Sequence, residues 1–224
     1  VSFQNITPVC TSIPNPCSTP GVVGIEEYVY QAIIILPNNC SDWILSVCES
    51  TRNAAINTII SPGTNDLCVE AELNNTNNYQ NSSPVFTEYP TPYICVNQIF
   101  CFNNGAVDPD GDSLVYSLVT PLNSIGGTVT YINPYSASNP ISGSTTFDAL
   151  TGDLCMLANQ LQVSIVAMKV SEYRNGVFIG SVIRDIQIIV LDNCSSTPPL
   201  LSGIDTIAPV NSDPSGGIAT HNFC

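Results

Sequence analysis

Positive charge is the scarcest feature of this sequence. Only four residues are Lys or Arg, against 18 Asp and Glu, and the formal net charge is −14. A surface of this sign repels phosphate backbones, so nucleic acids are not expected partners. Charged residues of both signs make up only 10% of the chain, whereas 44% of the residues are apolar. Because this apolar content can build a core, the sequence predicts a folded protein and not a disordered one.

Histidine and long apolar runs are also scarce. The chain has one histidine, His221, which lies near its end. Many zinc sites use histidine, and Ser–His–Asp and Cys–His catalytic groups require it, so we expect neither a zinc centre nor an enzyme. The longest apolar run, QAIIILP, is far too short to cross a bilayer. We therefore expect no direct membrane insertion.

Ten cysteines are present, and no two of them form a C-x-x-C pair. Their even number and irregular spacing favour disulfides over a metal site. Disulfides persist in oxidising compartments, so we expect an extracellular, secreted protein. The sequence opens without a methionine or a signal peptide, and both of its ends interrupt a pattern. We expect it to be a piece of a longer polypeptide.

Helical periodicity is nearly absent, and short apolar runs recur between Gly, Pro and Asn. This pattern is typical of an all-β protein. Asn175-Gly176 stands between two of the runs and predicts a tight hairpin. The expected strands are EEYVYQAIIIL, WILSVCE, DLCVEAELN, SLVYSLVTP, TVTYI, QVSIVAMKVSEY and VIRDIQIIVL.

Two polar breaks divide the chain, one at residues 74–83 and one at residues 194–217. They predict a first β-sandwich domain at residues 1–80, whose N-terminus begins in mid-pattern, and a second domain at residues 81–194. Residues 195–224 are expected to be a linker and the start of a further module.

Residues 81–194 carry a series of motifs in a fixed order: SPVF, DPDGDSLVY, FDALTGDL, EYRNGVFIG and RDIQ. In this combination they resemble the cadherin-like and PKD-like, immunoglobulin-like modules of large Bacteroidota surface proteins. The run from Tyr30 to Ile59 resembles the module that usually precedes them. Such proteins typically end in a gliding-motility-associated or type IX secretion sorting domain. The resemblance therefore implies export to the cell surface.

The spacing of strands and turns in the second segment independently suits an immunoglobulin-like sandwich. The fold expected for the chain is all-β, with tandem immunoglobulin-like β-sandwich domains that are disulfide-bonded. In that topology QIFCFNN and TGDLCML are neighbouring strands of one sheet, so we expect a Cys101–Cys155 bond. In the first segment, local loops are expected from Cys10 to Cys17 and from Cys40 to Cys48.

The stretch DPDGD places Asp108, Asp110 and Asp112 at alternate positions around Gly111. Two interpretations stay open. In the first, Pro109 and the aspartates build a turn whose carboxylates accept backbone N–H bonds. In the second, the same oxygens bind calcium, although the twelfth-position Glu of an EF-hand is missing. The sequence favours the turn first and calcium second.

The remaining polar features have simple structural interpretations. We expect Arg174 and Arg184 to pair within the chain with Glu172, Asp185 or the DPDGD aspartates, partner recognition being the alternative. Trp43 and the tyrosines are expected to pack on the sheets and not to form a sugar-binding platform. Thr206, in DTI, fits the O-glycosylation pattern associated with exported Bacteroidota proteins, which makes the chain a candidate glycoprotein.

Together these observations predict a structural or interaction segment of a cell-surface adhesin, stalk or extracellular filament built from tandem modules. Its expected partners are neighbouring modules of the same polypeptide or like subunits. The alternative is a carbohydrate-binding accessory module that binds surface polysaccharide.

Overall fold

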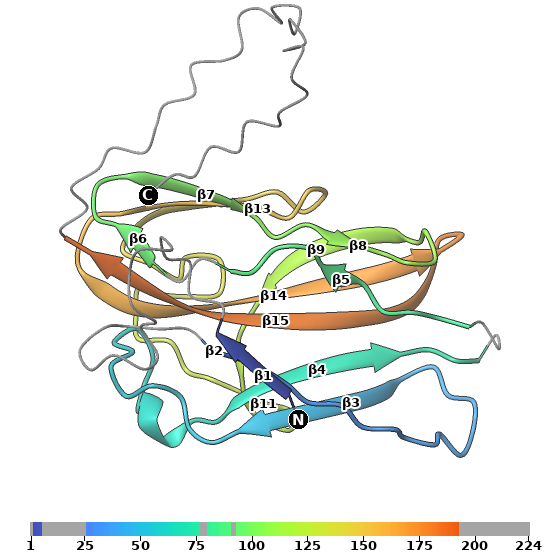
Figure 1. Cartoon of the computed structure of the whole chain (residues 1–224). Helices are drawn as coiled ribbons and strands as arrows, with labels where there is room; N and C mark the ends of the chain where they lie inside the picture. The colour runs from blue at the N-terminus through green and yellow to red at the C-terminus, as the bar shows by residue number, and fades with distance from the viewer. Residues whose placement is uncertain (1, 6–25, 77–79, 91–92, 193–224) are drawn as a thin grey trace, which may run out of the picture. The chain divides into compact units, whose positions relative to one another are not determined.

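Strands make up nearly all of the regular structure (Figure 1). The computed structural model describes residues 2–5, 26–76, 80–90 and 93–192. Its elements are β1 (Ser2–Asn5), β2 (Glu26–Val29), β3 (Trp43–Glu49), the 3₁₀ turn η2 (Pro62–Thr64), β4 (Leu67–Leu73), β5 (Val85–Phe86), β6 (Tyr93–Cys95), β7 (Ile99–Asn103), β8 (Ala106–Val107), β9 (Ser113–Val119), β10 (Leu122–Ser124), β11 (Gly127–Thr128), β12 (Gly143–Phe147), β13 (Asp153–Ala158), β14 (Gln162–Arg174) and β15 (Val177–Leu191). The predicted all-β class is confirmed.

The chain divides into two compact units. The smaller unit comprises Val1–Pro37 and Pro198–Cys224, and the larger one comprises Asn38–Thr197. In the described part of the smaller unit, β1 and β2 pair antiparallel, with Ser2 opposite Val29. All elements from β3 to β15 belong to the larger unit.

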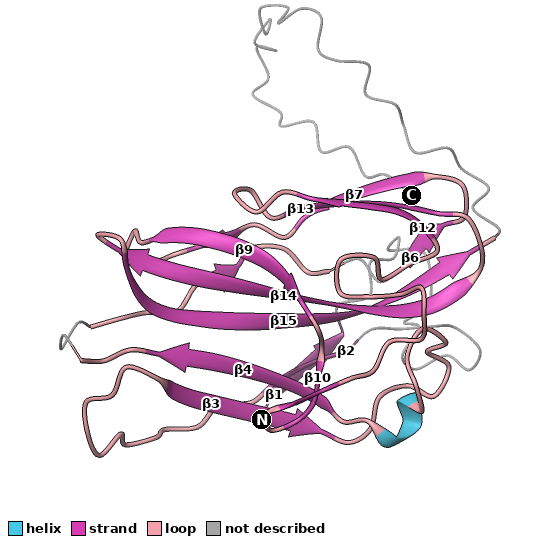
Figure 2. Ribbon diagram, turned by 180° about the vertical axis from the view of Figure 1, so that it is seen from behind, coloured by secondary structure: helices cyan, strands magenta, loops and turns pink. Residues whose placement is uncertain are grey.

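The larger unit has two main sheets that pack as a sandwich (Figure 2), and its short strands β5 and β8 form a separate antiparallel pair. In the first sheet the order is β11-β10-β4-β15-β14-β9, with β3 also paired to β4 and β6 paired in parallel to β15. The second sheet has the order β12-β13-β7. Leu154 and Met156 of β13 pack against Val166 of β14 and Ile188 of β15, so the main core lies between the two sheets. In these sheets β7 pairs with β13, and β14 pairs with both β9 and β15.

The strand β14 is buried on both of its faces. Val166 enters the core between the sheets, whereas its neighbour Ile165 enters a second cluster with Ile56, Ile59 and Val129. Successive side chains of a strand point to opposite faces, so the loop around residues 56–59 covers the outer face of β14. A near-continuous apolar sequence such as QVSIVAMKV is typical of a strand buried in this way.

The hairpin predicted from Asn175-Gly176 is confirmed. These two residues join β14 to β15, and both have positive φ values, 53° and 79°. Asn and Gly adopt such values at little cost, which sets a two-residue turn. The long β14–β15 ribbon that results is the scaffold for both sites described below.

The predicted boundary between residues 80 and 81 does not separate two compact units. Strand β4 of the first segment pairs with β15 of the second, with Leu73 opposite Gly180. The apolar cluster of Ile56, Ile59 and Ile165 also draws on both segments. Strand pairing and core packing thus connect the two predicted segments within one compact unit over Asn38–Thr197.

Candidate functional site

The DPDGD stretch forms a tight turn between β8 and β9. Oδ1 of Asp108 accepts hydrogen bonds from the backbone N–H groups of Asp110 and Asp112, both at 2.9 Å. Gly111 has a φ of 80°, which a glycine adopts without strain. The predicted Asx-type turn is thus present, and only one oxygen of Asp108 is used to build it.

Arg174, at the end of β14, pairs with this turn. Its Nε lies 2.8 Å from Oδ1 of Asp112 and its Nη2 lies 2.6 Å from Oδ2, a bidentate arrangement. Nη2 also lies 3.6 Å from Oδ2 of Asp110. The hydrogen bonds and the charge of Asp112 raise the pKa of Arg174. The expected pairing of Arg174 with the DPDGD aspartates is confirmed.

Residues 80–82, which precede β5, form hydrogen bonds with the DPDGD turn and with β14. Asn81 donates from Nδ2 to Oε1 of Glu172 at 2.5 Å, and the backbone N–H of Ser82 donates to Oδ2 of Asp110 at 2.6 Å. Arg174 in turn donates to the carbonyl oxygen of Gln80 at 3.1 Å. The described part of the predicted linker is thus attached to the turn and to β14.

Glu172 is the residue of this region that the sequence interpretation missed as a site. It is only 1% exposed. Its Oε1 accepts the bond from Asn81, whereas its buried Oε2 has no hydrogen-bond partner. The pKa of Glu172 is raised to about 7, chiefly by burial; a hydrogen bond to Asp108 and the charges of Asp108 and Asp112 add to the rise, and the hydrogen bond from Asn81 opposes it. A carboxyl group in these surroundings is costly to ionise.

Two local features bring Glu172 inward. The β14–β15 register shifts between Glu172 and Tyr173, a bulge of the kind that redirects side chains. Gly180 lies opposite Glu172 on β15, and a Cβ at Gly180 would collide with Oε1 of that glutamate. A glycine inside a strand often marks such a close approach, so Gly180 is the signal that could have identified Glu172.

Asp108, Asp112 and Glu172 form a carboxylate cluster. One oxygen from each residue lies within 4.8 Å of the other two. Oδ2 of Asp108, like Oε2 of Glu172, is buried without a hydrogen-bond partner. The structure therefore brings together two of the three predicted calcium ligands and replaces the third, Asp110, with Glu172. Oxygen ligands of this kind suit a hard cation.

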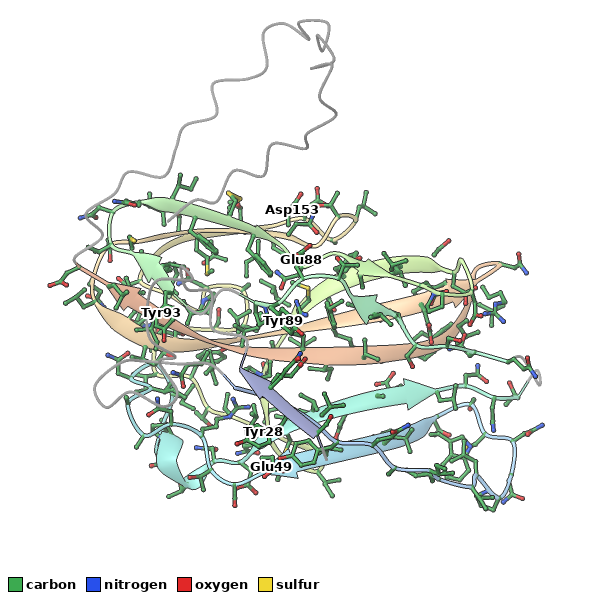
Figure 3. All side chains as sticks on the ribbon, viewed as in Figure 1. Tyr28, Glu49, Glu88, Tyr89, Tyr93 and Asp153 are labelled. Atoms are coloured by element: carbon green, nitrogen blue, oxygen red, sulfur yellow. A yellow bond between two sulfur atoms is a disulfide. The ribbon has the colours of Figure 1, made fainter. Side chains whose placement is uncertain are left out.

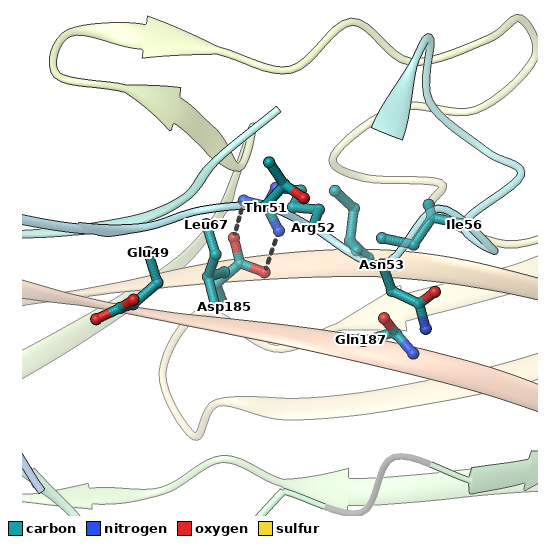
Figure 4. A pocket seen from close by; sticks show the side chains of 9 residues that line it. Glu49, Thr51, Arg52, Asn53, Ile56, Leu67, Asp185 and Gln187 are labelled. Atoms are coloured by element: carbon teal, nitrogen blue, oxygen red, sulfur yellow. Dashed lines mark hydrogen bonds and ion pairs between the residues drawn. The ribbon is translucent and has the colours of Figure 1, made fainter. Parts of the chain in front are cut away.

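A separate pocket of about 180 Å³ lies beside the middle of β15 (Figure 4). Its floor is an ion pair in which Nη1 and Nη2 of Arg52 lie 3.2 and 2.6 Å from the carboxylate oxygens of Asp185. Burial raises the pKa of Asp185, and the hydrogen bond and charge of Arg52 oppose that shift. The lining residues are Glu49, Thr51, Arg52, Asn53, Ile56, Leu67, Ile165, Asp185 and Gln187.

Arg184 has a different partner from those expected. Its guanidinium lies 3.9 Å from the ring centroid of Phe86 and donates to the carbonyl oxygen of Glu88 at 2.8 Å. Burial lowers the pKa of Arg184 to about 10. Asp185, its expected partner, binds Arg52 instead, because successive residues of β15 point to opposite faces.

Disulfides connect directly paired strands. Cys101 of β7 is bonded to Cys155 of β13, as predicted. The predicted Cys40–Cys48 loop is wrong: Cys48 of β3 is bonded to Cys68, which lies opposite it on β4, and Cys40 is a free thiol that contacts Asp42. The register of β3 against β4 places Cys48 opposite Cys68 and so determines which cysteine it bonds. Both bonds indicate an oxidising environment.

Cys95 is also disulfide-bonded. Cys10, Cys17, His221 and the candidate acceptor Thr206 lie outside the described residues. Where the chain is described, none of its helical structure is long and apolar enough to span a membrane. Among the described tyrosines Tyr116 is buried, whereas Tyr28, Tyr30 and Tyr89 are more than half exposed; Figure 3 labels Tyr28 and Tyr89.

Comparisons with known proteins give little further information. No family model matches the chain, and no curated protein matches it. Among solved structures it is similar to a nucleoside hydrolase-related hypothetical protein from Saccharophagus degradans that is associated with carbohydrate metabolism. The sequence identity is 16%, the TM-score is 0.32, and the match covers 50% of this chain and 26% of that one. A likeness at this level carries no argument about activity.

Proposed function

We propose that this chain is a structural and interaction segment of a secreted cell-surface protein, such as an adhesin, stalk or extracellular filament. The observation that carries the proposal is an apolar run after β2, at residues 30–36, which is extended but belongs to no strand. Ile33, Ile34 and Ile35 are 94%, 60% and 89% exposed. Contiguous exposed apolar surface of this kind is typical of a protein interaction site.

The partner that suits this run is a like module, a second copy of this chain serving as its simplest representative. Residues 28–39 contain no charged side chain, although the chain as a whole carries −14. The net charge makes two such chains repel one another, and this repulsion is weakest where the contacting surfaces carry no charged side chains. An extended apolar segment binds well by adding a strand to a partner, since main-chain hydrogen bonds then supplement side-chain burial. Pro37 lacks an N–H group and ends the segment.

The test is the oligomeric state of the oxidised chain, measured by light scattering across a concentration series. We expect concentration-dependent self-association that strengthens as salt rises, because salt screens the net repulsion. Ile33→Asp combined with Ile35→Asp should abolish it.

A matched control is available in Ile125, which is 79% exposed on the β10–β11 connection. Ile125→Asp should leave association unchanged. A wild-type chain that stays monomeric at several hundred micromolar in high salt would contradict the proposal.

We propose further that the segment is not an enzyme. Support comes from the pocket, where two of the three ionisable lining groups, Arg52 and Asp185, neutralise one another and leave only Glu49. General acid–base chemistry commonly uses two groups with separated pKa values, and a lone Glu49 does not supply them. A hydrolase assay panel that showed turnover sensitive to Glu49→Gln would overturn this part.

Glycan binding is a second candidate function, favoured by the same pocket. Its volume, about 180 Å³, suits a single sugar ring, and Asn53, Gln187 and Glu49 offer polar groups beside the apolar Leu67. A glycan array decides between the candidates. Binding that is lost in Gln187→Ala and retained in Trp43→Ala would identify the pocket as the site. Loss in Trp43→Ala alone would place it on β3.

Export by a sorting-domain route and glycosylation of Thr206 stay predictions from the sequence. Mass spectrometry of the protein from its natural source tests the glycan directly.

A further inference from the structure

The carboxylate cluster contains two buried oxygens that accept no hydrogen bond from another protein group. Oε2 of Glu172 and Oδ2 of Asp108 are both buried and without a hydrogen-bond partner, and Glu172 is only 1% exposed. Buried polar atoms nearly always have a partner, because an unpaired one costs about 1–3 kcal/mol. Two carboxylates in this position are satisfied either by a proton on Glu172, which then hydrogen-bonds to Asp108, or by a cation that both of them bind.

The net charge of the cluster also favours a bound cation. Asp108, Asp112 and Glu172 carry three negative charges when ionised, and Arg174 binds Asp112 through both of its oxygens. One guanidinium neutralises one carboxylate, so ionising Glu172 as well as Asp108 leaves an excess of two negative charges in a buried place. Asp110 adds a further carboxylate at the edge, where it contacts Ser82 and Arg174.

We propose that Asp108, Asp112 and Glu172 bind a single calcium ion. The three oxygens lie within 4.8 Å of one another, as ligands on opposite or adjacent sides of one calcium ion do when each is about 2.4 Å from it. Oxygens of Asp112 retain a second lone pair beyond the bond from Arg174. Magnesium fits less well, because it demands near-octahedral geometry and retains several waters.

Calcium at this position links three segments. Asp108 and Asp112 belong to the turn before β9, Glu172 belongs to β14, and Asn81 attaches the segment before β5 through its bond to Glu172. Binding is thus expected to rigidify this end of the larger unit. With three protein carboxylates, the dissociation constant should be on the order of 0.1–1 mM, the range of extracellular calcium modules.

The experiment is calorimetric titration of calcium chloride into the whole oxidised chain at pH 7.5, after chelation and desalting. We expect one ion per chain, binding at least tenfold weaker for magnesium chloride, and a rise in Tm with calcium. Glu172→Gln and Asp108→Asn should each weaken binding at least tenfold. Asp108→Asn retains the oxygen that builds the turn, so it serves if the Glu172 variant misfolds.

Asp110→Asn is the matched control, since Asp110 belongs to the same turn but not to the cluster. It should change affinity by less than about threefold. Absence of calcium heat in the folded wild-type chain would overturn the proposal. Unchanged binding in both Glu172→Gln and Asp108→Asn would also overturn it. So would carbon-13 spectra that show Glu172 still protonated at pH 7.5 in saturating calcium, because the two oxygens would then share a proton.

Discussion

Arg52 and Asp185 form a buried ion pair between groups 133 residues apart in the sequence. Nη2 of Arg52 lies 2.6 Å from Oδ2 of Asp185, and the two side chains are only 3% and 2% exposed. Arg52 also donates to the carbonyl oxygen of Leu122 at 2.7 Å. The pair therefore attaches the loop after β3 to the middle of β15 and to β10.

Removing either charge of this pair should be strongly destabilising. Arg52→Met leaves the Asp185 carboxylate buried without its counter-ion, and Asp185→Leu leaves the guanidinium in the same position. Each single variant should lower the free energy of unfolding by about 3–5 kcal/mol. The double variant should lose less than either single one, since an apolar pair of similar volume replaces the charges. Denaturant unfolding of all four proteins measures this cycle.

Lys169 and Glu72 provide the comparison pair. Their side chains are 2.7 Å apart at Nζ and Oε1 but 24% and 32% exposed. Lys169→Met should therefore cost no more than about 1 kcal/mol. Equal losses at the exposed and the buried pair would contradict the role given to burial.

Unfolding of Asn38–Thr197 should be a single cooperative transition. The sheet runs from β4 directly to β15, and Ile56 and Ile59 cover Ile165 of β14. We expect the calorimetric and van't Hoff enthalpies of a chain comprising residues 38–197 to agree. Two transitions, with only the later one sensitive to Ile165→Ala, would restore the two-domain interpretation.

The sequence predicted the parts of the fold that depend on local pattern. Strand patterns located β3, β4, β9, β14 and β15, and Asn175-Gly176 located the hairpin, because turn chemistry and alternation act over a few residues. The Cys101–Cys155 bond followed from topology. The pairing of β4 with β15 across residues 74–83 was not predicted. A polar run of this kind has the same composition whether it links two domains or connects two strands of one domain.

Only the part of the candidate site that is local in the sequence was predicted. Asp108, Asp110 and Asp112 are visible as a motif because they are close in the sequence. Glu172 reaches them only because β14 bulges and Gly180 leaves space, and neither feature is apparent from spacing. Likewise, the choice of Cys68 over Cys40 as the partner of Cys48 depends on strand register.

The two assigned disulfides should differ in their contribution to stability. Cys101–Cys155 spans 54 residues and Cys48–Cys68 spans 20. In the chain-entropy account their removal costs about 4 and about 3 kcal/mol, since a longer loop restricts the unfolded chain more. Paired Cys→Ala variants compared by denaturant unfolding test the order.

Cys40→Ala is the control for those variants, because Cys40 is a free thiol. Its effect should stay within about 0.5 kcal/mol. Alkylation of the folded, unreduced protein should label Cys40 and none of Cys48, Cys68, Cys101 or Cys155. Recovery of Cys101 or Cys155 with a label would contradict the assigned bond.

The last prediction concerns pH in the absence of calcium. The folded-state pKa of Glu172 is about 7, above its ordinary value of 4.5, because of burial and the neighbouring Asp108 and Asp112. Between these values the unfolded chain has released the proton while the folded chain retains it. The unfolded state then binds fewer protons, so the stability must fall as pH rises from about 4.5 to about 7, and the loss is complete above 7. A shift of this size corresponds to about 3 kcal/mol.

Glu172→Gln removes this loss, since glutamine keeps the shape of the protonated side chain and cannot ionise. In a chelating buffer, the variant should therefore gain stability relative to wild type by about 3 kcal/mol between pH 4.5 and pH 8. The difference between the two proteins isolates Glu172 from the other titrating groups, among them Asp185. Denaturant unfolding at a series of pH values measures it. Parallel stability curves for the two proteins would show that Glu172 is already ionised near its ordinary pKa, and that the cluster holds its charge without a proton.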